Sequence, residues 1–378
     1  MSEFDTIIIG AGIAGMSVAY ELSKKQKVLV LEQEINPGYH STGRSAAVYV
    51  ASYKSDDCAI QILTNASWPM FKNPPARFTE NQLYRDRGLL YIAEKSHLNE
   101  LASFYDDLQS TNTKVEWVGK NFIKEKFPLL RDQYAEHAVY DTNAYDIDVN
   151  ELMEGYRRGL RQSGGSLKPA FRVTDIIKKS EQWLVSNGQE TFQARNLVNA
   201  AGAWCDEIAK MAHVSPIGIQ CLRRSAALIN LDVNDQTKDF ANWPMAVEFK
   251  ESFYFKPDAG KLLVSPANED PAVACDVQPE ELDIAYAADF AEKALHLTVK
   301  RIDHSWAGLR NFVADRRPVI GFDPEAEGFF WLAGQGGTGV QTAPAAARLA
   351  ASLILGEAIP RDLQDLGLSA DVVSPSRL

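Results

Sequence analysis

The segment from Pro37 to Val50, PGYHSTGRSAAVYV, brings together side chains that can bind an anionic ligand. It carries hydroxyl groups, a cation and a small residue: Ser41, Thr42, Gly43, Arg44 and Ser45. We expect a helix to begin near Gly43 and run through Val50, with its N-terminus toward the ligand. A surface helix capped by serine or threonine is the alternative.

The start of the chain has the pattern of a dinucleotide-binding fold. The sequence predicts strands over 6–9 and 27–31 and a helix over 13–24, with a GxGxxG motif between the first strand and the helix: Gly10, Gly12 and Gly15. Such glycines allow a tight turn, close approach to a pyrophosphate and close packing of helix on strand. Glu32, after the second strand, can bond ribose hydroxyls, which argues against NADP and leaves NAD and FAD open.

Length, charge and cysteine usage exclude several other classes. The chain has 378 residues and a net charge of −11, which favours two domains and disfavours nucleic acid as a partner. Its four cysteines are scattered without metal-binding spacing, so we expect no metal site and a reducing compartment. No apolar run approaches the roughly 20 residues of a membrane-spanning helix. We predict a cytoplasmic protein with at most peripheral membrane contact.

Several blocks of the sequence carry a family resemblance. They are HSTGRSAA (40–47), LVNAAGAWCD (197–206), RRSA (223–226), ESFYFKPDAG (251–260), WAGLRNFVAD (306–315) and AGQGGTGVQT (333–342). Together with the glycine motif, they resemble the D-amino-acid-oxidase-like family of FAD-dependent oxidoreductases, and within it the bacterial catabolic D-arginine dehydrogenases. The blocks extend along most of the chain.

This resemblance implies an α/β (α+β) fold: a Rossmann-like FAD-binding domain and a second, mixed-sheet substrate-binding domain. We place the FAD-binding domain at 1–83, 144–215 and 305–378, and the substrate-binding domain at 84–143 and 216–304. Short β-rich runs such as GLLYIAEK, MAVEF and KLLVSP fit a sheet that covers the flavin.

The resemblance also implies the cofactor site. Besides the residues above, we predict cofactor contacts at Ala14, Gln33, Ala46, Ala47, Val173, Ala200, Ala201, Gly202, Trp204, Arg310, Gly334, Gly336, Gly337, Thr338, Gly339 and Val340. The glycine-rich 334–339 segment precedes an alanine-rich helix, whose positive end suits an anionic reduced flavin. Some relatives hold the flavin through a cysteine near FVADRRPVIG, where this chain has none, so we expect FAD to be non-covalent.

Oxidation of an amino acid by a flavin moves a hydride from Cα to N5 and requires a bound, oriented substrate carboxylate. Arginine suits that task because its planar group can hold both oxygens. The family pattern assigns catalytic or carboxylate-binding roles to Arg224, Arg310, Tyr53 and Tyr254, although Arg223 could replace Arg224. Cross-strand aromatic packing is the alternative role of Tyr254.

The predicted substrate pocket contains Val48, Arg87, Met245, Val247 and Gly337. Relatives with basic substrates carry histidine in place of Val48 and glutamate in place of Arg87, and an arginine there would repel a cationic side chain. We therefore predict a D-amino acid dehydrogenase not restricted to D-arginine, with a quinone or oxygen as electron acceptor. A glycine- or sarcosine-type amine oxidase and a 2-hydroxy acid oxidoreductase are the alternatives.

Overall fold

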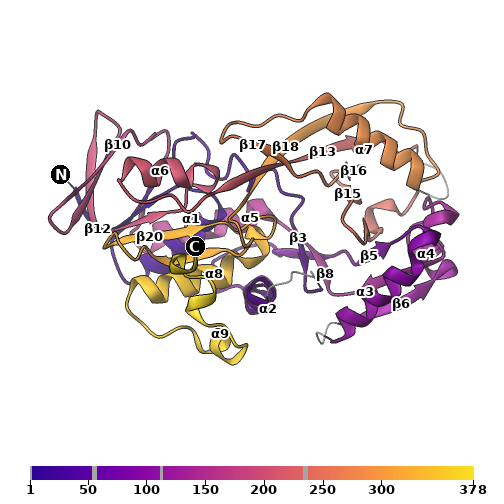
Figure 1. Ribbon diagram of the computed structural model, residues 1–378, viewed down its shortest axis with the longest axis horizontal. Helices are drawn as coiled ribbons and strands as arrows, with labels where there is room; N and C mark the ends of the chain where they lie inside the picture. Colours follow the sequence, from indigo (N-terminus) through magenta and orange to yellow (C-terminus); the bar gives the residue numbers. More distant parts are fainter. Residues whose placement is uncertain (1, 53–57, 111–113, 233–236) are drawn as a thin grey trace.

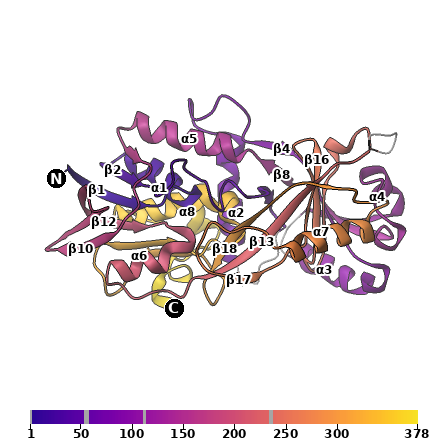
Figure 2. The same cartoon turned by 90° about the horizontal axis from the view of Figure 1, so that it is seen from above.

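The computed structural model describes residues 2–52, 58–110, 114–232 and 237–378. Two large sheets lie toward opposite ends of the long axis, and both chain termini lie in the half that contains the first sheet (Figures 1 and 2). A three-stranded sheet lies between them, formed by β3 (Val48–Val50), β8 (Ala144–Ile147) and β4 (Tyr84–Asp86).

The first sheet has a parallel centre. β2 (Val28–Leu31) pairs with β1 (Ser2–Ile9), β1 with β12 (Thr191–Asn199), and the end of β12 with β20 (Phe329–Ala333). The outer strands are β9 (Ser166–Lys168), β10 (Asp175–Lys179), β11 (Gln182–Ser186) and β19 (Val319–Phe322). This arrangement confirms the predicted strand–helix–strand start.

Alternation along β1 explains why the sheet is buried on both faces. Ile8 packs into a core with α1 (Ile13–Ser23) and α8 (Gly339–Ile354). Its neighbours Ile7 and Ile9 point to the opposite core, which contains α6 (Cys205–Met211). Successive strand residues face opposite sides, so a continuous apolar run serves both layers.

Further helices complete the first layer. α1 packs against α8 and against α5 (Val149–Gln162), and α8 also contacts α2 (Cys58–Lys72). The short α9 (Arg361–Asp365) lies near α2. The alanine-rich helix predicted after the glycine-rich segment is therefore present as α8.

The second sheet is mixed, as expected. Its order is β17 (Asp270–Ala272), β13 (Gln220–Ile229), β16 (Lys261–Ser265), β15 (Tyr254–Asp258), β14 (Met245–Glu248), β5 (Leu89–Ile92), β7 (His137–Asp141) and β6 (Val115–Gly119). β18 (Ile302–Phe312) joins it by pairing along β13. The helices of this part are α3 (Leu98–Ser110), α4 (Lys120–Lys126) and α7 (Glu281–Ala294).

The predicted boundary at residue 305 falls inside β18, one strand of the second sheet. All strands of the first sheet lie within the segments assigned to the FAD-binding domain. We keep the division into two domains as a proposal.

The helix predicted from Gly43 to Val50 is wrong. Residues 41–44 form a turn, and the segment then continues as β3, paired with β8. Ala47 has a φ of 39°, outside the right-handed helical region, and the following Val-Tyr-Val run has high strand propensity.

Candidate active site

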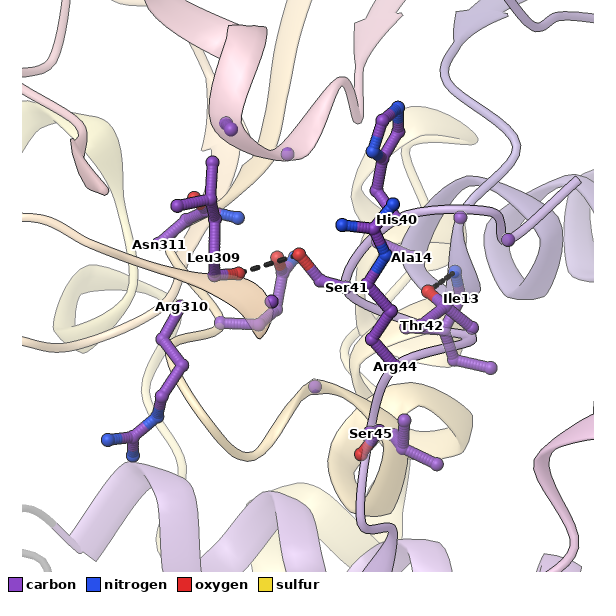
Figure 3. Close-up of a pocket in the computed structure, with 18 of the residues that line it drawn as sticks. Ile13, Ala14, His40, Ser41, Thr42, Arg44, Ser45, Leu309, Arg310 and Asn311 are labelled. Atoms are coloured by element: carbon purple, nitrogen blue, oxygen red, sulfur yellow. Dashed lines mark hydrogen bonds between the residues drawn. The ribbon is translucent and has the colours of Figure 1, made fainter. Parts of the chain in front are cut away.

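A cavity of about 400 Å³ lies between the two large sheets, a volume typical of ligand sites. One side is formed by the glycine turn, the segment from Gly38 to Val50 and the start of α8. The other side is formed by β5, β13, β14, β15 and β18. Figure 3 shows Leu309, Arg310 and Asn311 beside the segment that carries His40, Ser41, Thr42, Arg44 and Ser45, with a hydrogen bond from Ser41 to Leu309.

The glycine turn has the geometry of a nucleotide site. Gly10 has a φ of +100°, and a Cβ there would lie 2.4 Å from the Ala200 carbonyl oxygen. A Cβ at Gly15 would lie 1.9 Å from the Gly10 carbonyl oxygen, so Gly15 allows helix and strand to pack closely. Gly12 is less crowded, since its nearest contact would be the Thr42 hydroxyl at 3.4 Å, and it lines the cavity.

Glu32 is held in place at the end of β2. Its Oε2 accepts a hydrogen bond from the Ala11 amide at 2.6 Å, and its Oε1 accepts one from the Glu34 amide at 2.9 Å. The side chain is buried and lines the cavity. This position suits a ribose contact, which stays a prediction.

The hydroxyl groups of residues 41–45 bond to the protein itself. Thr42 Oγ1 accepts from the Ile13 amide at the start of α1 (3.0 Å), and Ser41 Oγ donates to the Leu309 carbonyl (2.6 Å; Figure 3). Ser45 Oγ accepts from the Ala47 amide at 3.0 Å. These residues line the cavity while they shape its wall.

Arg44 lines the cavity as predicted for a cofactor residue, but its guanidinium is bonded to the protein. Its Nη1 donates to the Val277 carbonyl at 2.9 Å and to the Ala307 carbonyl at 3.1 Å, and its Nη2 pairs with Asp276. The side chain lines the cavity, but its charge is compensated by Asp276. Arg44 therefore fastens this segment to β18 and the 276–277 loop rather than offering a free cation to a phosphate.

The other predicted cofactor residues fall into two groups. The first group, Gly15, Gly43 and Gly334, lies outside the cavity wall and shapes the backbone behind that wall. At Gly43, for example, a Cβ would lie 2.7 Å from the Gly38 carbonyl oxygen. The remaining ones line the cavity: Ala14, Gln33, Ala46, Ala47, Val173, Ala200, Ala201, Gly202, Trp204, Gly336, Gly337, Thr338, Gly339 and Val340.

Two unassigned polar residues also line the cavity. Asn311 Oδ1 and Gln335 Nε2 are buried and have no hydrogen-bond partner among the described residues. An unsatisfied buried donor and acceptor are costly unless a ligand completes them. This pair therefore fits a cofactor with a polar edge. Both residues lie in blocks quoted for the family resemblance, Asn311 in WAGLRNFVAD and Gln335 in AGQGGTGVQT, but neither was predicted as a site residue.

The two predicted arginines come together through strand register. Leu222 on β13 pairs with Arg310 on β18, and Arg224 pairs with Gly308. Directly opposed residues and those two apart share one face of a sheet, so both arginine side chains lie on the cavity face. A Cβ at Gly337 would lie 2.2 Å from the Arg310 guanidinium, so glycine makes room for this group.

Among the described residues, Glu269 is the carboxylate that pairs with both arginines. Its Oε1 contacts Arg310, lies 3.3 Å from Arg224 Nη2 and lies 2.9 Å from Nη2 of a third arginine, Arg316. Burial, followed by the neighbouring charge of Arg310, lowers the pKa of Arg224. Glu269 and Arg316 were missed in the sequence because their contacts depend on the second sheet's register.

Arg223 is not an alternative to Arg224. It lies on the opposite face of β13, where Nε donates to Asp283 at 2.9 Å and Nη1 pairs with Glu280. A third carboxylate, Asp270, lies 3.4 Å from its Nη2.

The predicted pocket role of Arg87 is also corrected. Its side chain is fully buried, and it donates to Asp146 at 2.5 Å (Nη2) and 2.8 Å (Nε). Its Nη1 donates to the Ala241 and Trp243 carbonyls, both at 2.8 Å. The guanidinium is bonded to Asp146 and to two carbonyls and does not line the cavity, so Arg87 is not the pocket residue that was predicted.

The other predicted pocket residues line the cavity. Strand alternation puts Met245 and Val247 of β14 on the same apolar face as Leu89 of β5 and Val48 of β3. Tyr254, opposite Val247 in the β14–β15 pair, also lines it. Tyr53 lies outside the described residues.

The glycine turn on a parallel sheet, the facing mixed sheet and the arginine pair define a nucleotide-cofactor-dependent oxidoreductase. A model of the DAO family, described as FAD dependent oxidoreductase, matches residues 5–353, and the chain belongs to this family. The cofactor is FAD, and the orphaned Asn311 and Gln335 groups fit its presence.

Similar proteins cover nearly the whole chain. Glycine oxidase from Geobacillus kaustophilus is 22% identical over 98% of this chain and 97% of its own length. Its crystal structure gives a TM-score of 0.84 at 20% identity, covering 98% of this chain and 99% of that one. Hydrogen cyanide synthase subunit HcnC from Pseudomonas aeruginosa is 22% identical over 95% of this chain and 94% of its own.

The structure of L-proline dehydrogenase from P. horikoshii gives a TM-score of 0.83 at 21% identity, covering 100% of this chain and 98% of that one. These similarities confirm the predicted mixed α/β fold. Among the described residues, no helix is long and apolar enough to cross a bilayer.

Proposed function

We propose that this protein oxidises the Cα–N bond of D-amino acids with uncharged side chains, giving an imino acid that water converts to a 2-oxo acid and ammonia. The observation that carries the proposal is the arginine pair, Arg224 and Arg310, facing a cavity with an apolar wall. FAD, when bound, accepts the hydride from Cα, which carries both electrons of the oxidation.

The arginines would bind and orient the substrate carboxylate. The side chain of Arg310 is 13% exposed and that of Arg224 16% exposed, so both act where water screens charge weakly. Tyr254 would add a hydroxyl donor to the same end of the substrate. These contacts fix the carboxylate while the amine and Cα–H take their positions.

The apolar wall would receive the side chain. Met245, Val247, Leu89 and Val48 present aliphatic groups to the cavity and offer no charged partner to a guanidinium or ammonium group. This wall, rather than Arg87, now supports the expectation that D-arginine is not preferred.

A second candidate is an amine oxidase of the glycine or sarcosine type. Two of the similar proteins carry those names: glycine oxidase from Geobacillus kaustophilus and human peroxisomal sarcosine oxidase. Both names describe substrates with an amine next to a carboxylate, which the same arginine pair would bind.

Anaerobic mixing of the holoenzyme with single substrates tests these candidates. We expect D-Met, D-Leu and D-Phe to bleach the flavin faster than D-Arg, glycine or sarcosine, and L-enantiomers to have little effect. Faster bleaching by glycine or sarcosine would favour the second candidate, and D-Arg ahead of the neutral D-amino acids would contradict the side-chain assignment. Bleaching by 2-hydroxy acids without ammonia release would contradict amine oxidation altogether. Turnover with oxygen and with a quinone dye identifies the acceptor.

A further inference from the structure

Glu269 has an unusual position at the arginine pair. It lies in the connection between β16 and β17, in a cavity that adjoins the main one and shares Tyr91, Arg224 and Glu251 with it. Arg316 also lines this second cavity. The Glu269 carboxylate thus reaches the arginines from outside the main cavity.

The two oxygens of Glu269 have different partners. Oε1 is shared by Arg224, Arg310 and Arg316. Oε2 is bonded to Arg316 at 3.1 Å, so Arg316 contacts both oxygens. Losing the contacts to Arg224 and Arg310 would therefore leave Glu269 with a charge partner.

The exposure of the four side chains falls from Arg316 through Glu269 to the two cavity arginines. The side chain of Arg316 is 51% exposed and that of Glu269 32%, whereas Arg224 and Arg310 are 16% and 13% exposed. The glutamate therefore bridges an inner pair of cations and one outer cation.

The residue next to Glu269 is anchored by hydrogen bonds that do not involve the Glu269 side chain. The preceding residue, Asn268, accepts from Arg224 Nε through its carbonyl (2.9 Å) and from the Ser225 amide through Oδ1 (2.9 Å). The side-chain amide of Asn268 (Nδ2) also donates to the Asp270 carboxylate at 2.7 Å. Rotation of the Glu269 side chain toward Arg316 leaves these bonds intact.

We propose that Glu269 is an internal competitor for the substrate carboxylate: it occupies the inner arginine pair without substrate and retreats to Arg316 when a carboxylate binds. This inference rests on the proposed function, because it requires a substrate carboxylate at Arg224 and Arg310. The competition sets the affinity for every carboxylate ligand of the site by reducing the fraction of molecules ready to bind.

Glu280 provides a matched control. It is also a glutamate paired with an arginine of β13, but its partner Arg223 faces α7 instead of the cavity. Glu280, at the N-terminus of α7, lies outside the inner arginine pair, so Glu280→Gln removes one negative charge beside β13 without touching the proposed competition.

Titration calorimetry of the holoenzyme with propionate tests the proposal, because propionate has a carboxylate but no amine to oxidise. We expect Glu269→Gln to bind propionate on the order of tenfold more tightly than the wild type. Glu269→Asp keeps the charge and Glu280→Gln keeps the competitor, so both should bind within about threefold of the wild type. The KM for the best D-amino acid should fall in Glu269→Gln while kcat stays within about threefold.

Arg316→Met gives an independent test with the opposite sign. Without Arg316, Glu269 has only the inner pair as partner, and propionate should bind several-fold more weakly than to the wild type. Arg316 is half-exposed, so we expect Arg316→Met to fold. It therefore tests the proposal even if Glu269→Gln does not fold.

Equal or weaker propionate binding by Glu269→Gln, with wild-type binding present, would overturn the competition and leave the proposed function standing. Tighter binding by Arg316→Met would overturn it in the same way. If neither the wild type nor Glu269→Gln binds propionate, and no amino acid, glycine and sarcosine included, bleaches the flavin, the proposed function fails. This inference then fails with it.

Discussion

The arginine clusters on the two faces of β13 have opposite charge balance: carboxylates are in excess on one face and cations on the other. On the α7 face, the single cation of Arg223 meets three carboxylates, those of Asp270, Glu280 and Asp283. On the cavity face, the cations of Arg224, Arg310 and Arg316 share one carboxylate, that of Glu269.

This difference separates a structural ion cluster from a binding site. An arginine surrounded by carboxylates has no capacity for another anion and serves to fasten α7 to the sheet. Two partly buried arginines that share one carboxylate oxygen retain the capacity to bind a further anion. Neighbouring positions in one strand therefore serve different purposes because strand alternation exposes them to different surroundings.

The largest effect should come from removing a cation on the cavity face. Arg310→Met should lower kcat/KM for the best D-amino acid by about 10²- to 10³-fold, since losing one partner of a buried charge pair costs about 3–4 kcal/mol. The flavin absorbance spectrum of the purified variant reports whether FAD is retained. Arg301→Met, an exposed arginine just before β18, is the control and should stay within about twofold. Unchanged kcat/KM in Arg310→Met would break the distinction between the two faces.

A third ion cluster, formed by Asp146 with Arg87 and Lys256, extends the comparison to buried cations that are paired inside the protein. Asp146 bonds Arg87 and also lies 3.0 Å from Lys256 Nζ, which donates to the Ala46 carbonyl beside the cavity. Asp146→Asn should reduce the free energy of unfolding by about 3–4 kcal/mol at neutral pH, because the buried cations of Arg87 and Lys256 lose the carboxylate that they share. Urea denaturation measures this change.

The pH dependence of that loss has a defined sign. Burial alone would raise the pKa of Asp146, but Lys256 and Arg87 outweigh it and hold the pKa below its usual value. A lowered folded-state pKa contributes stability above the unfolded-state pKa, and that stability disappears as the pH falls through the folded-state pKa. The gap between wild type and Asp146→Asn should thus be widest near neutrality and shrink with acidification. A gap that widened on acidification would contradict the ion-pair assignment.

Some of this arrangement follows from local sequence and some does not. The turn after β1 was predictable because Gly10, Gly12 and Gly15 act through contacts within a short segment and a nearby strand end. The strand β3 was missed because its partner β8 lies almost one hundred residues later, and pairing decided between helix and strand.

Arg87 and Arg224 show the same limit within the site. The charge of Arg87 was visible, but its partner Asp146 lies 59 residues away, and only folding reveals the pair. The choice between Arg223 and Arg224 depended on which face of β13 turns to the cavity. Sequence identifies candidate charges, whereas sheet register decides which of them remain available for a ligand.

The buried carboxylate of the α7 face should affect stability without affecting binding. Asp283 accepts from Arg223 Nε and from the Ser225 hydroxyl at 2.6 Å, and its side chain is 7% exposed. Asp283→Asn should lower the free energy of unfolding by about 2–3 kcal/mol. Its kcat/KM should stay within about twofold of the wild type, measured below the unfolding transition. A large rise in KM at unchanged stability would mean that the α7 face also communicates with the site.

The smallest effect is expected at the outer edge of the same cluster. Glu280 contacts the same arginine as Asp283, but its side chain is 64% exposed, so water compensates most of its charge after substitution. Glu280→Gln should change the free energy of unfolding by about 0.5 kcal/mol and leave kcat/KM unchanged. Urea denaturation of Glu280→Gln and Asp283→Asn side by side isolates burial from charge, because both remove one negative charge next to Arg223. Equal destabilisation by the two variants would mean that net charge, rather than the buried hydrogen bonds of Asp283, fastens α7 to β13.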